Sequence, residues 1–541
     1  MQFWGKSLKF SRGTMVAAAL FWSVLLILLL HWYFSFYPSY ASFDQGIFNQ
    51  LFWNGTHGRF FQSSLSSTLS SAVTQSGELA DVSYHRLGQH FTPALLLWLP
   101  IYALFPASIT LLILQITIVT AAGLVLYILA CQYLNPKLST LITISFYAAN
   151  AVIGPTLANF HDSCQLPLYM FGLLLALEKR SWWWFGGLAL LVPMVREDAG
   201  VVLFSLGVYL VLSRRYPRIG LAVCTYSMSY MLLVTNVVMP WFSEDISRRF
   251  MIEQFGSYID GNEASTLDVI WALISQPQKL LAEIFNPLDR KINYLLGHWL
   301  PLAFVPAISP SAWSIAGFPL LQILIRDDGS AININLRYAM TLLPGLFYGT
   351  ILWWSHRPQA LKLLVKQFWI ACISLSLFFT FTSNPNRTWS FIIPDSFNPW
   401  VYVSLPSQWR HVGHIRSFLD QIPDDASASA TKHIIPHLSS RRELVRFPSV
   451  KLRNDAGEAI NVEYVVLDLK QLQQYQVAFD REREKLQAFV PEIERILIEG
   501  EYGLVGLQDG IVFMQLGETS DPAALQRWAE YRQEIDPILH S

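Results

Sequence analysis

Long apolar runs fill most of the chain before residue 383, and short polar clusters separate them. A run of roughly 16–25 apolar residues is long enough to cross a bilayer when tilt is allowed for. The pattern therefore predicts about eleven membrane-crossing helices, at residues 14–37, 107–131, 138–158, 163–178, 182–197, 199–213, 217–240, 291–309, 311–326, 337–355 and 366–382. The apolar segment 91–105 contains Pro93 and Pro100, which favours a re-entrant or interfacial helix.

Composition divides the chain into two parts. Hydrophobic residues make up 52% of it and charged residues only 14%, and the shortage of charge, unusual for a soluble protein, ends near residue 383. We therefore predict a mostly α-helical polytopic membrane domain at residues 1–382 and a soluble α/β domain at residues 383–541. The net charge of −1 argues against a nucleic-acid partner, and the lipid bilayer is the expected surrounding.

The C-terminal part combines helix and strand patterns. Val412–Ile422 and Pro491–Ile498 have helical spacing, and Val462–Leu467 has the composition of a buried strand. Tyr502–Leu507 and Ile511–Gln515 flank an Asp-Gly pair, which predicts a β-hairpin with a primed turn. This part has no glycine-rich phosphate loop.

The distribution of Lys and Arg predicts the orientation. With a cytoplasmic N terminus, the basic residues Lys6, Lys9 and Arg12 and those of the short connectors fall on the cytoplasmic side. The long loops 38–90 and 241–290 and the C-terminal domain then lie outside the cytoplasm, which in a bacterium would mean the outer side of the inner membrane. We expect the Ser/Thr-rich stretch 62–76 to be a flexible surface loop and the amphipathic loop 241–290 to form helices on the membrane surface.

Three polar clusters next to apolar runs are candidates for chemistry. They contain Asp44, His161-Asp162 and Arg196-Glu197-Asp198. Ionisable groups beside hydrocarbon are costly and commonly functional. If the clusters lie on one side of the membrane, they can form one site. The full set of candidates is Asp44, His90, His161, Asp162, Arg196, Glu197, Asp198, Arg337 and Tyr338.

Each candidate also has a structural explanation. Asp44 suits a helix cap or turn as well as a general base. Glu197 and Asp198 would repel each other unless Arg196 neutralises them or a metal binds. Arg337 is either an interfacial arginine or a phosphate ligand. In the connector before it, Arg326 can pair with Asp327 or Asp328. His85 and His90 do not have a zinc-site spacing.

The motifs and their order resemble a bacterial family of predicted membrane proteins called domain of unknown function 2079. The matching segments are Ser42–Gln50 with Trp53 and Gly55, Gly88–Pro93, Leu99–Tyr102, Gln115, Asn159–Asp162, Arg196–Gly200, Arg337-Tyr338, Ile422-Pro423, Pro436–Ser439, Arg441 and Tyr464–Asp468.

That family is distantly similar to the C-type glycosyltransferase superfamily, which takes sugars from polyprenyl-phosphate carriers outside the cytoplasm. The resemblance implies that Asp44 matches an essential acidic residue of the first outer loop and serves as the base. Arg337, Arg196 or a divalent cation such as Mg²⁺ or Mn²⁺ would stabilise the leaving phosphate. Asp44, Glu197 and Asp198 are the candidate metal ligands. The candidate residues for binding the lipid-linked sugar are His90, His161, Asp162, Arg196, Glu197, Asp198, Arg337 and Tyr338.

Two other functions fit the same residues. In a membrane transporter, the acids and histidines would form a proton relay. Transporters often have internal repeats and helices broken at the midplane, whereas this sequence has no internal repeat and its acids fall at predicted helix ends. A non-enzymatic membrane scaffold that presents the C-terminal domain would not require the polar clusters to converge.

Overall fold

The structure, a computed structural model, describes residues 10–36, 42–259, 261–357 and 362–540. Lys6 and Lys9 lie outside the described residues. The chain forms two compact units, neither of which is continuous in sequence. The first unit contains Met1–Leu28, Leu87–Trp98 and Leu112–Pro385, and the second contains Leu29–Arg86, Leu99–Leu111 and Asn386–Ser541. The predicted boundary after residue 382 lies close to Asn386, where the chain passes from the first unit to the second for the last time. Most of loop 38–90, however, belongs to the second unit.

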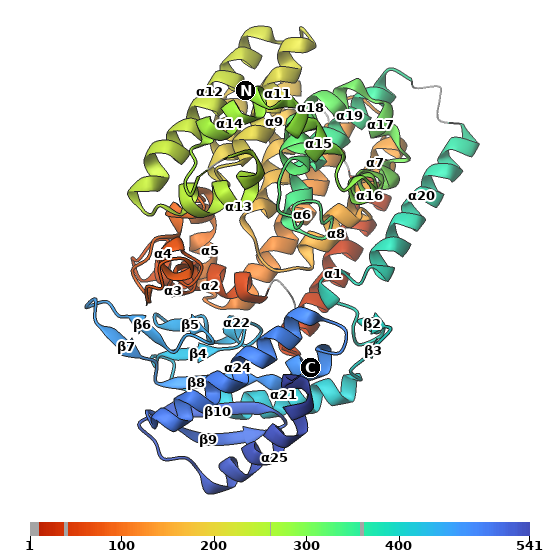
Figure 1. The fold of residues 1–541 in the computed structure, drawn as a ribbon. Coiled ribbons are helices and arrows are strands. Elements are labelled where there is room, and N and C mark those ends of the chain that lie inside the picture. The colour runs from red at the N-terminus through yellow and green to blue at the C-terminus, as the bar shows by residue number, and fades with distance from the viewer. Residues whose placement is uncertain (1–9, 37–41, 260, 358–361, 541) are drawn as a thin grey trace. The chain divides into compact units, whose positions relative to one another are not determined.

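Helices dominate the chain before residue 383 (Figure 1). Among the described residues, four helices are long and apolar enough to cross a membrane, or five if one bent pair counts as a single span. They are α1 (Arg12–Phe34), α6 (Ser108–Ala130), Pro217–Trp241, which contains α12 (Pro217–Leu233), and α20 (Leu363–Thr382). The bent pair is α7 (Pro136–Tyr147) with α8 (Asn150–Thr156), at an angle of 44°.

The count of eleven crossings is not confirmed, because the remaining helices are shorter. Helices of 13–15 residues rise roughly 20–22 Å, less than the roughly 30 Å of a bilayer core. The first unit also contains α9 (Leu166–Glu178), α10 (Trp182–Leu191), α11 (Ala199–Leu212), α13 (Met251–Phe255), α14 (Thr266–Ser275), α15 (Pro277–Phe285), α16 (Leu288–Trp299), α17 (Val305–Ile308), α18 (Pro310–Leu324) and α19 (Leu343–Ser355). The expected apolar helix near residue 91 is present as Pro93–Leu104.

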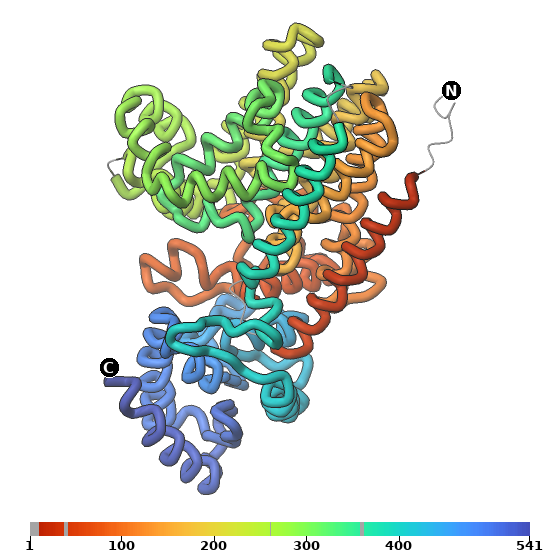
Figure 2. The backbone as a smooth tube through the Cα atoms, turned by 90° about the vertical axis from the view of Figure 1, so that its right-hand side faces the viewer, coloured from red at the N-terminus to blue at the C-terminus, as the bar shows by residue number. Residues whose placement is uncertain are grey.

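Small residues set the closest helix contacts of the first unit. Gly345 and Gly349 of α19 face Ala312 and Ala316 of α18, so that a Cβ at Gly345 would lie 2.7 Å from the backbone nitrogen of Ala316. This arrangement is typical of membrane helices, which associate through small residues four apart. Figure 2 shows the helices before residue 383 from a second side.

The second unit is built on a five-stranded mixed sheet with the order β5-β4-β8-β10-β9. Its strands are β4 (Ala428–Ala430), β5 (Leu444–Arg446), β8 (Tyr464–Asp468), β9 (Tyr502–Gln508) and β10 (Ile511–Leu516). β4 is parallel to β5 and β8, and β10 is antiparallel to β8 and β9. The predicted hairpin is confirmed, with Asp509 and Gly510 at positive φ in its turn.

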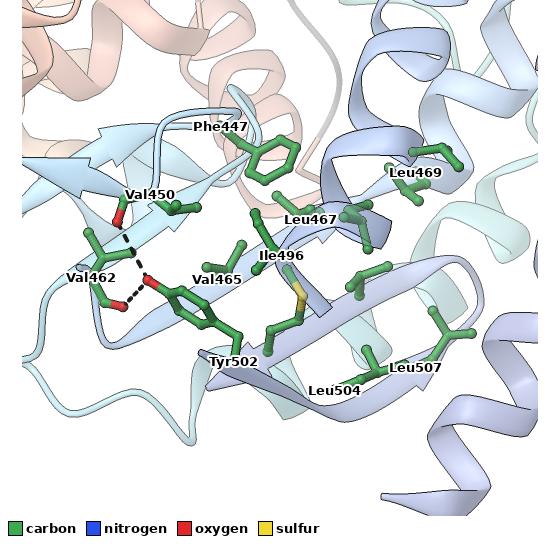
Figure 3. Packing of buried hydrophobic residues seen from close by; sticks show 14 of the residues in the cluster. Phe447, Val450, Val462, Val465, Leu467, Leu469, Ile496, Tyr502, Leu504 and Leu507 are labelled. Carbon is green, nitrogen blue, oxygen red and sulfur yellow. Dashed lines mark hydrogen bonds between the residues drawn. The ribbon is translucent and has the colours of Figure 1, made fainter. Parts of the chain in front are cut away.

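Helices cover both faces of this sheet. The C-terminal helices are α21 (Leu405–Leu419), α22 (Ile435–Leu438), α23 (Leu469–Tyr475), α24 (Asp480–Glu499) and α25 (Pro522–Leu539). Val465 and Leu467 of β8 face α24 and α25 in one core, where the Tyr502 hydroxyl donates to the backbone oxygen of Val462 at 2.6 Å (Figure 3). On the opposite face, Phe418 of α21 stacks on Phe513.

The loop 38–90 is more ordered than its composition suggests. It contains α2 (Ser42–Thr56), α3 (Ser64–Ser67), α4 (Ser71–Thr74) and β1 (Ala80–Asp81), and β1 pairs in parallel with β6 (Lys451–Arg453), next to β7 (Ala459–Asn461). The prediction of a flexible surface loop at residues 62–76 is wrong. Ser64 is fully buried, and its hydroxyl donates to the backbone oxygen of Leu444 at 2.7 Å. Serines here satisfy buried backbone groups instead of meeting water.

Candidate functional site

The segment Arg196-Glu197-Asp198 connects two apolar helices of the first unit, the short 3₁₀ helix η4 (Val192–Met194) and α11. The Arg196 guanidinium lies 3.5 Å from the carboxylate of Glu197 and 3.3 Å from that of Asp198. The predicted ion pairing within this segment is therefore confirmed. Because Arg196 and Glu197 are buried, each depends on the other for charge compensation.

His90 belongs to the same cluster. Its Nδ1 lies 2.9 Å from Oε1 of Glu197, and the backbone N–H of Phe91 donates to Oε2 at 3.0 Å. Both oxygens of Glu197 are thereby fixed by residues more than a hundred positions away in the sequence. The sequence suggested His90 and Glu197 separately, and the structure brings them together.

Three guanidinium groups surround the ring of Tyr338. The Cζ atoms of Arg326, Arg337 and Arg196 lie 4.4, 5.5 and 5.6 Å from the ring centroid. Tyr338 opens the stretch before α19, in the 3₁₀ helix η10 (Arg337–Thr341). An aromatic face attracts cations, and the acids paired with Arg196 and Arg326 reduce the repulsion among the three guanidinium groups. Arg326 was not among the sequence candidates, and its predicted pairing is confirmed with Asp328, at 3.3 Å.

His161 and Asp162 are held next to α6 and η10. The side chain of Gln115 on α6 donates to the backbone oxygen of Thr156 at 3.0 Å and accepts from the backbone N–H of His161 at the same distance. Asp162 is buried and accepts from the N–H and hydroxyl of Ser163, at 2.6 and 2.9 Å. The 3₁₀ helix that it begins, η3 (Asp162–Gln165), contacts η10, so these residues border the Tyr338 cluster.

The predicted divalent-metal site does not fit the residues that the structure describes. Among them, no group of three or more His, Cys, Asp or Glu side chains is arranged to hold a metal ion. Glu197 and Asp198 already have the cation of Arg196 between them, which supplies the counter-charge that Mg²⁺ or Mn²⁺ would bring. We therefore assign no step to a metal at these residues.

Asp44 belongs to the second unit, in the first turn of α2, where its charge suits the helix dipole. The ring of Phe43, the residue before it, lies 4.7 Å from the guanidinium of Arg446. α2 packs on α22 through Gly46, beside which a Cβ would clash with Ile435. The sequence identified this acid but placed it in a loop, because the apolar pattern of α2 is too short to suggest a span.

A second polar network, absent from the sequence candidates, surrounds Asp468 in the second unit. His411 donates to the Asp468 carboxylate at 2.8 Å and to Asp509 at 2.8 Å, and His433 donates to Asp468 at 3.0 Å. Burial alone would lower the pKa of His411, but attraction by Asp468 and the two hydrogen bonds outweigh it and raise the pKa to about 10. The same contacts hold the pKa of the buried Asp468 well below its ordinary range.

These features define an integral membrane protein with polar clusters at the ends of its apolar helices. Residues 34–513 match the model of a family described as predicted membrane protein (DUF2079), and the chain belongs to this family. The predicted resemblance is thereby confirmed. No curated protein matches the chain.

Among solved structures, the chain is similar to ArnT from Cupriavidus metallidurans, crystallised with undecaprenyl phosphate. The two are 10% identical, with a TM-score of 0.50 over 95% of this chain and 100% of that chain. At this identity the likeness is one of fold.

Proposed function

We propose that this protein transfers a sugar from a polyprenyl-phosphate donor to an acceptor outside the cytoplasm. The observation that carries the proposal is the Tyr338 cluster, in which Arg196, Arg326 and Arg337 converge on one ring. Guanidinium groups bind phosphate through paired N–H donors. The fold likeness to a protein crystallised with undecaprenyl phosphate supports the same chemistry.

The arginine cluster is suited to stabilise a leaving phosphate. Nε of Arg326 is buried and has no hydrogen-bond acceptor among the described residues, so a phosphate oxygen would supply one. When the bond between the anomeric carbon and the phosphate oxygen breaks, its electron pair goes to the phosphate. The three cations would stabilise that developing charge in a site shielded from water.

The acids have separate roles in the proposal. Glu197, held by His90 and the N–H of Phe91, would accept a hydrogen bond from a sugar hydroxyl without changing position. Asp44 would remove the proton of the acceptor hydroxyl while the oxygen of that hydroxyl bonds to the anomeric carbon. This assignment requires the Asp44 carboxylate to reach the acceptor hydroxyl.

The rival function is transport. A proton relay requires ionisable groups along a path through the membrane. The acids and arginines around Tyr338 lie instead near the ends of η4 and α18 and at the starts of α11, η3 and η10. A cluster at helix ends favours a reaction at the membrane surface over passage through it.

Mass spectrometry of glycolipids and surface glycans tests the proposal. Cells would carry the wild-type protein, Asp44→Asn or Glu197→Gln. The expected result is loss of a glycan mass and accumulation of its lipid-linked precursor in both variants. Asp420→Asn and Glu253→Gln, which change exposed acids, are the matched controls and should resemble the wild type. Wild-type profiles in Asp44→Asn, with equal protein levels, would refute Asp44 as the base.

A further inference from the structure

The second unit contains a cavity of about 280 Å³ at one edge of its sheet. Lys432 follows β4, Arg446 ends β5 and Asp468 ends β8, and these three parallel strands lie in the order β5-β4-β8. The cavity therefore lies at the edge that the carboxyl ends of these strands form. β4 comes first in the chain and lies between β5 and β8, which follow it. In open sheets of this kind, ligands bind outside the carboxyl ends of the strands where the strand order reverses.

The lining of this cavity contains more basic than acidic side chains. Lys432, Arg446 and Lys485 line it, as do Glu482 and Asp468. Asp468 is engaged by His411 and His433, and Glu482 lies 3.9 Å from Lys485. Three cations and two acids thus line the cavity, and by this composition the lining has an excess of positive charge.

Lys432 is the cation that burial affects most. The pKa of Lys432 is lowered to about 7, chiefly by burial and further by the nearby charge of Lys485. The charges of Arg387 and Arg446 act in the same direction, whereas that of Glu482 opposes them. A bound anion would offset both the burial and the repulsion. The remaining wall is apolar and aromatic, with Phe447 and Phe489 in edge-to-face contact.

We propose that this cavity is a second ligand site, which binds a phosphate-bearing molecule through Lys432, Arg446 and Lys485. Its apolar wall would contact the part of the ligand next to the phosphate. The sequence has no glycine-rich loop here, so side-chain cations replace the backbone N–H groups that commonly hold phosphate at such an edge. The site differs in residues and in unit from the Tyr338 cluster and does not depend on sugar transfer.

The phosphate has two possible sources, a polyprenyl-phosphate headgroup or a soluble phosphate ester. Two probes separate them: inorganic phosphate, and undecaprenyl phosphate supplied in nanodiscs. Calorimetry on the full-length protein, at matched ionic strength with sodium chloride, would give the affinity for each. Binding of inorganic phosphate that Lys432→Gln weakens supports a soluble ester, and binding of undecaprenyl phosphate alone that Lys432→Gln weakens supports a lipid headgroup. Binding that Lys432→Gln leaves unchanged belongs to the Tyr338 cluster and not to this cavity.

Variants connect the binding to the cavity. Lys432→Gln and Lys485→Gln should weaken binding at least tenfold, whereas Lys451→Gln, at an exposed lysine of β6, should leave it unchanged. Glu482→Gln should tighten binding several-fold, because it removes a competing negative charge; misfolding cannot produce this gain. Binding of neither probe by the wild type, or equal binding by Lys432→Gln and Lys451→Gln, would overturn the proposal.

Discussion

At the scale of single residues, Asp468 shows how the second unit handles a buried charge. Its carboxylate accepts from His411 and His433 and from the backbone N–H of Gln471, and so it also caps α23. A buried carboxylate is tolerated only with such compensation. One residue thereby joins α21, the loop after β4 and the end of β8.

His411→Asn is expected to destabilise the protein by about 2–4 kcal/mol near pH 6, close to the effect of breaking a buried ion pair. The pKa of His411 is raised from 6.5 to about 10 in the folded protein. Its stabilisation is therefore complete below about pH 6.5 and is lost as the pH rises through about 10. Thermal denaturation from pH 5 to 10 measures the difference from the wild type.

The exposed His540→Asn is the control for this series and should match the wild type at every pH. A difference between His411→Asn and the wild type that stays constant from pH 6 to pH 10 would contradict the charged state assigned to His411.

The sequence allows local pairs to be predicted but not distant ones. Arg196 lies next to its two acids in the chain, and Arg326 is two residues from Asp328, so their pairing follows from proximity. His90 and Glu197 are 107 positions apart, and hydrophobic periodicity does not say which helix ends meet. Arg196, Arg337 and Tyr338 were expected to belong to one site, but Arg326, which also contacts the Tyr338 ring, was not predicted as a member.

At the scale of elements, glycines decide how closely α18 and α19 approach. A Cβ at Gly349 would overlap the backbone of Ala312, whereas nothing lies within 4 Å of one at Gly317. We expect Gly349→Ala to destabilise the protein by about 1–3 kcal/mol through overpacking. Gly317→Ala, the same change on α18, should be neutral or stabilising by roughly 0.5–1 kcal/mol.

Thermal denaturation of both glycine variants in one detergent compares them directly. Equal midpoints for Gly349→Ala and Gly317→Ala would show that α18 and α19 are not in close contact.

Elements with strong local signals were predicted well. The Asp-Gly turn predicted the hairpin of β9 and β10, and long apolar runs predicted α1, α6, α20 and the helix from Pro217. α2 was missed because it is buried by contacts with distant residues, such as the hydrogen bond from Asn49 to Ser439 at 2.9 Å. Buried serines in α3 likewise depend on partners in the C-terminal part.

At the scale of the whole molecule, the second unit takes in segments from the chain's N-terminal region. Leu29–Arg86 and Leu99–Leu111 join Asn386–Ser541 in one compact unit. Composition alone would assign those segments to the membrane part. It carries no information about pairing between distant segments, such as that of β1 with β6. Asp44 and the Lys432 cavity thus share a unit, while the Tyr338 cluster belongs to the other.

The proposed function assigns the phosphate of the donor to the Tyr338 cluster. The orientation of the termini, which the Lys and Arg distribution predicts, would place this cluster on the extracytoplasmic side.

Electron cryomicroscopy of the protein in nanodiscs with undecaprenyl phosphate tests this account most directly. We predict phosphate density within hydrogen-bonding distance of Arg196, Arg326 or Arg337. Phosphate density confined to the Lys432 cavity would support that site alone and contradict the proposed transfer site. An Asp44 side chain that faces bulk water, away from the arginines, would contradict it as well.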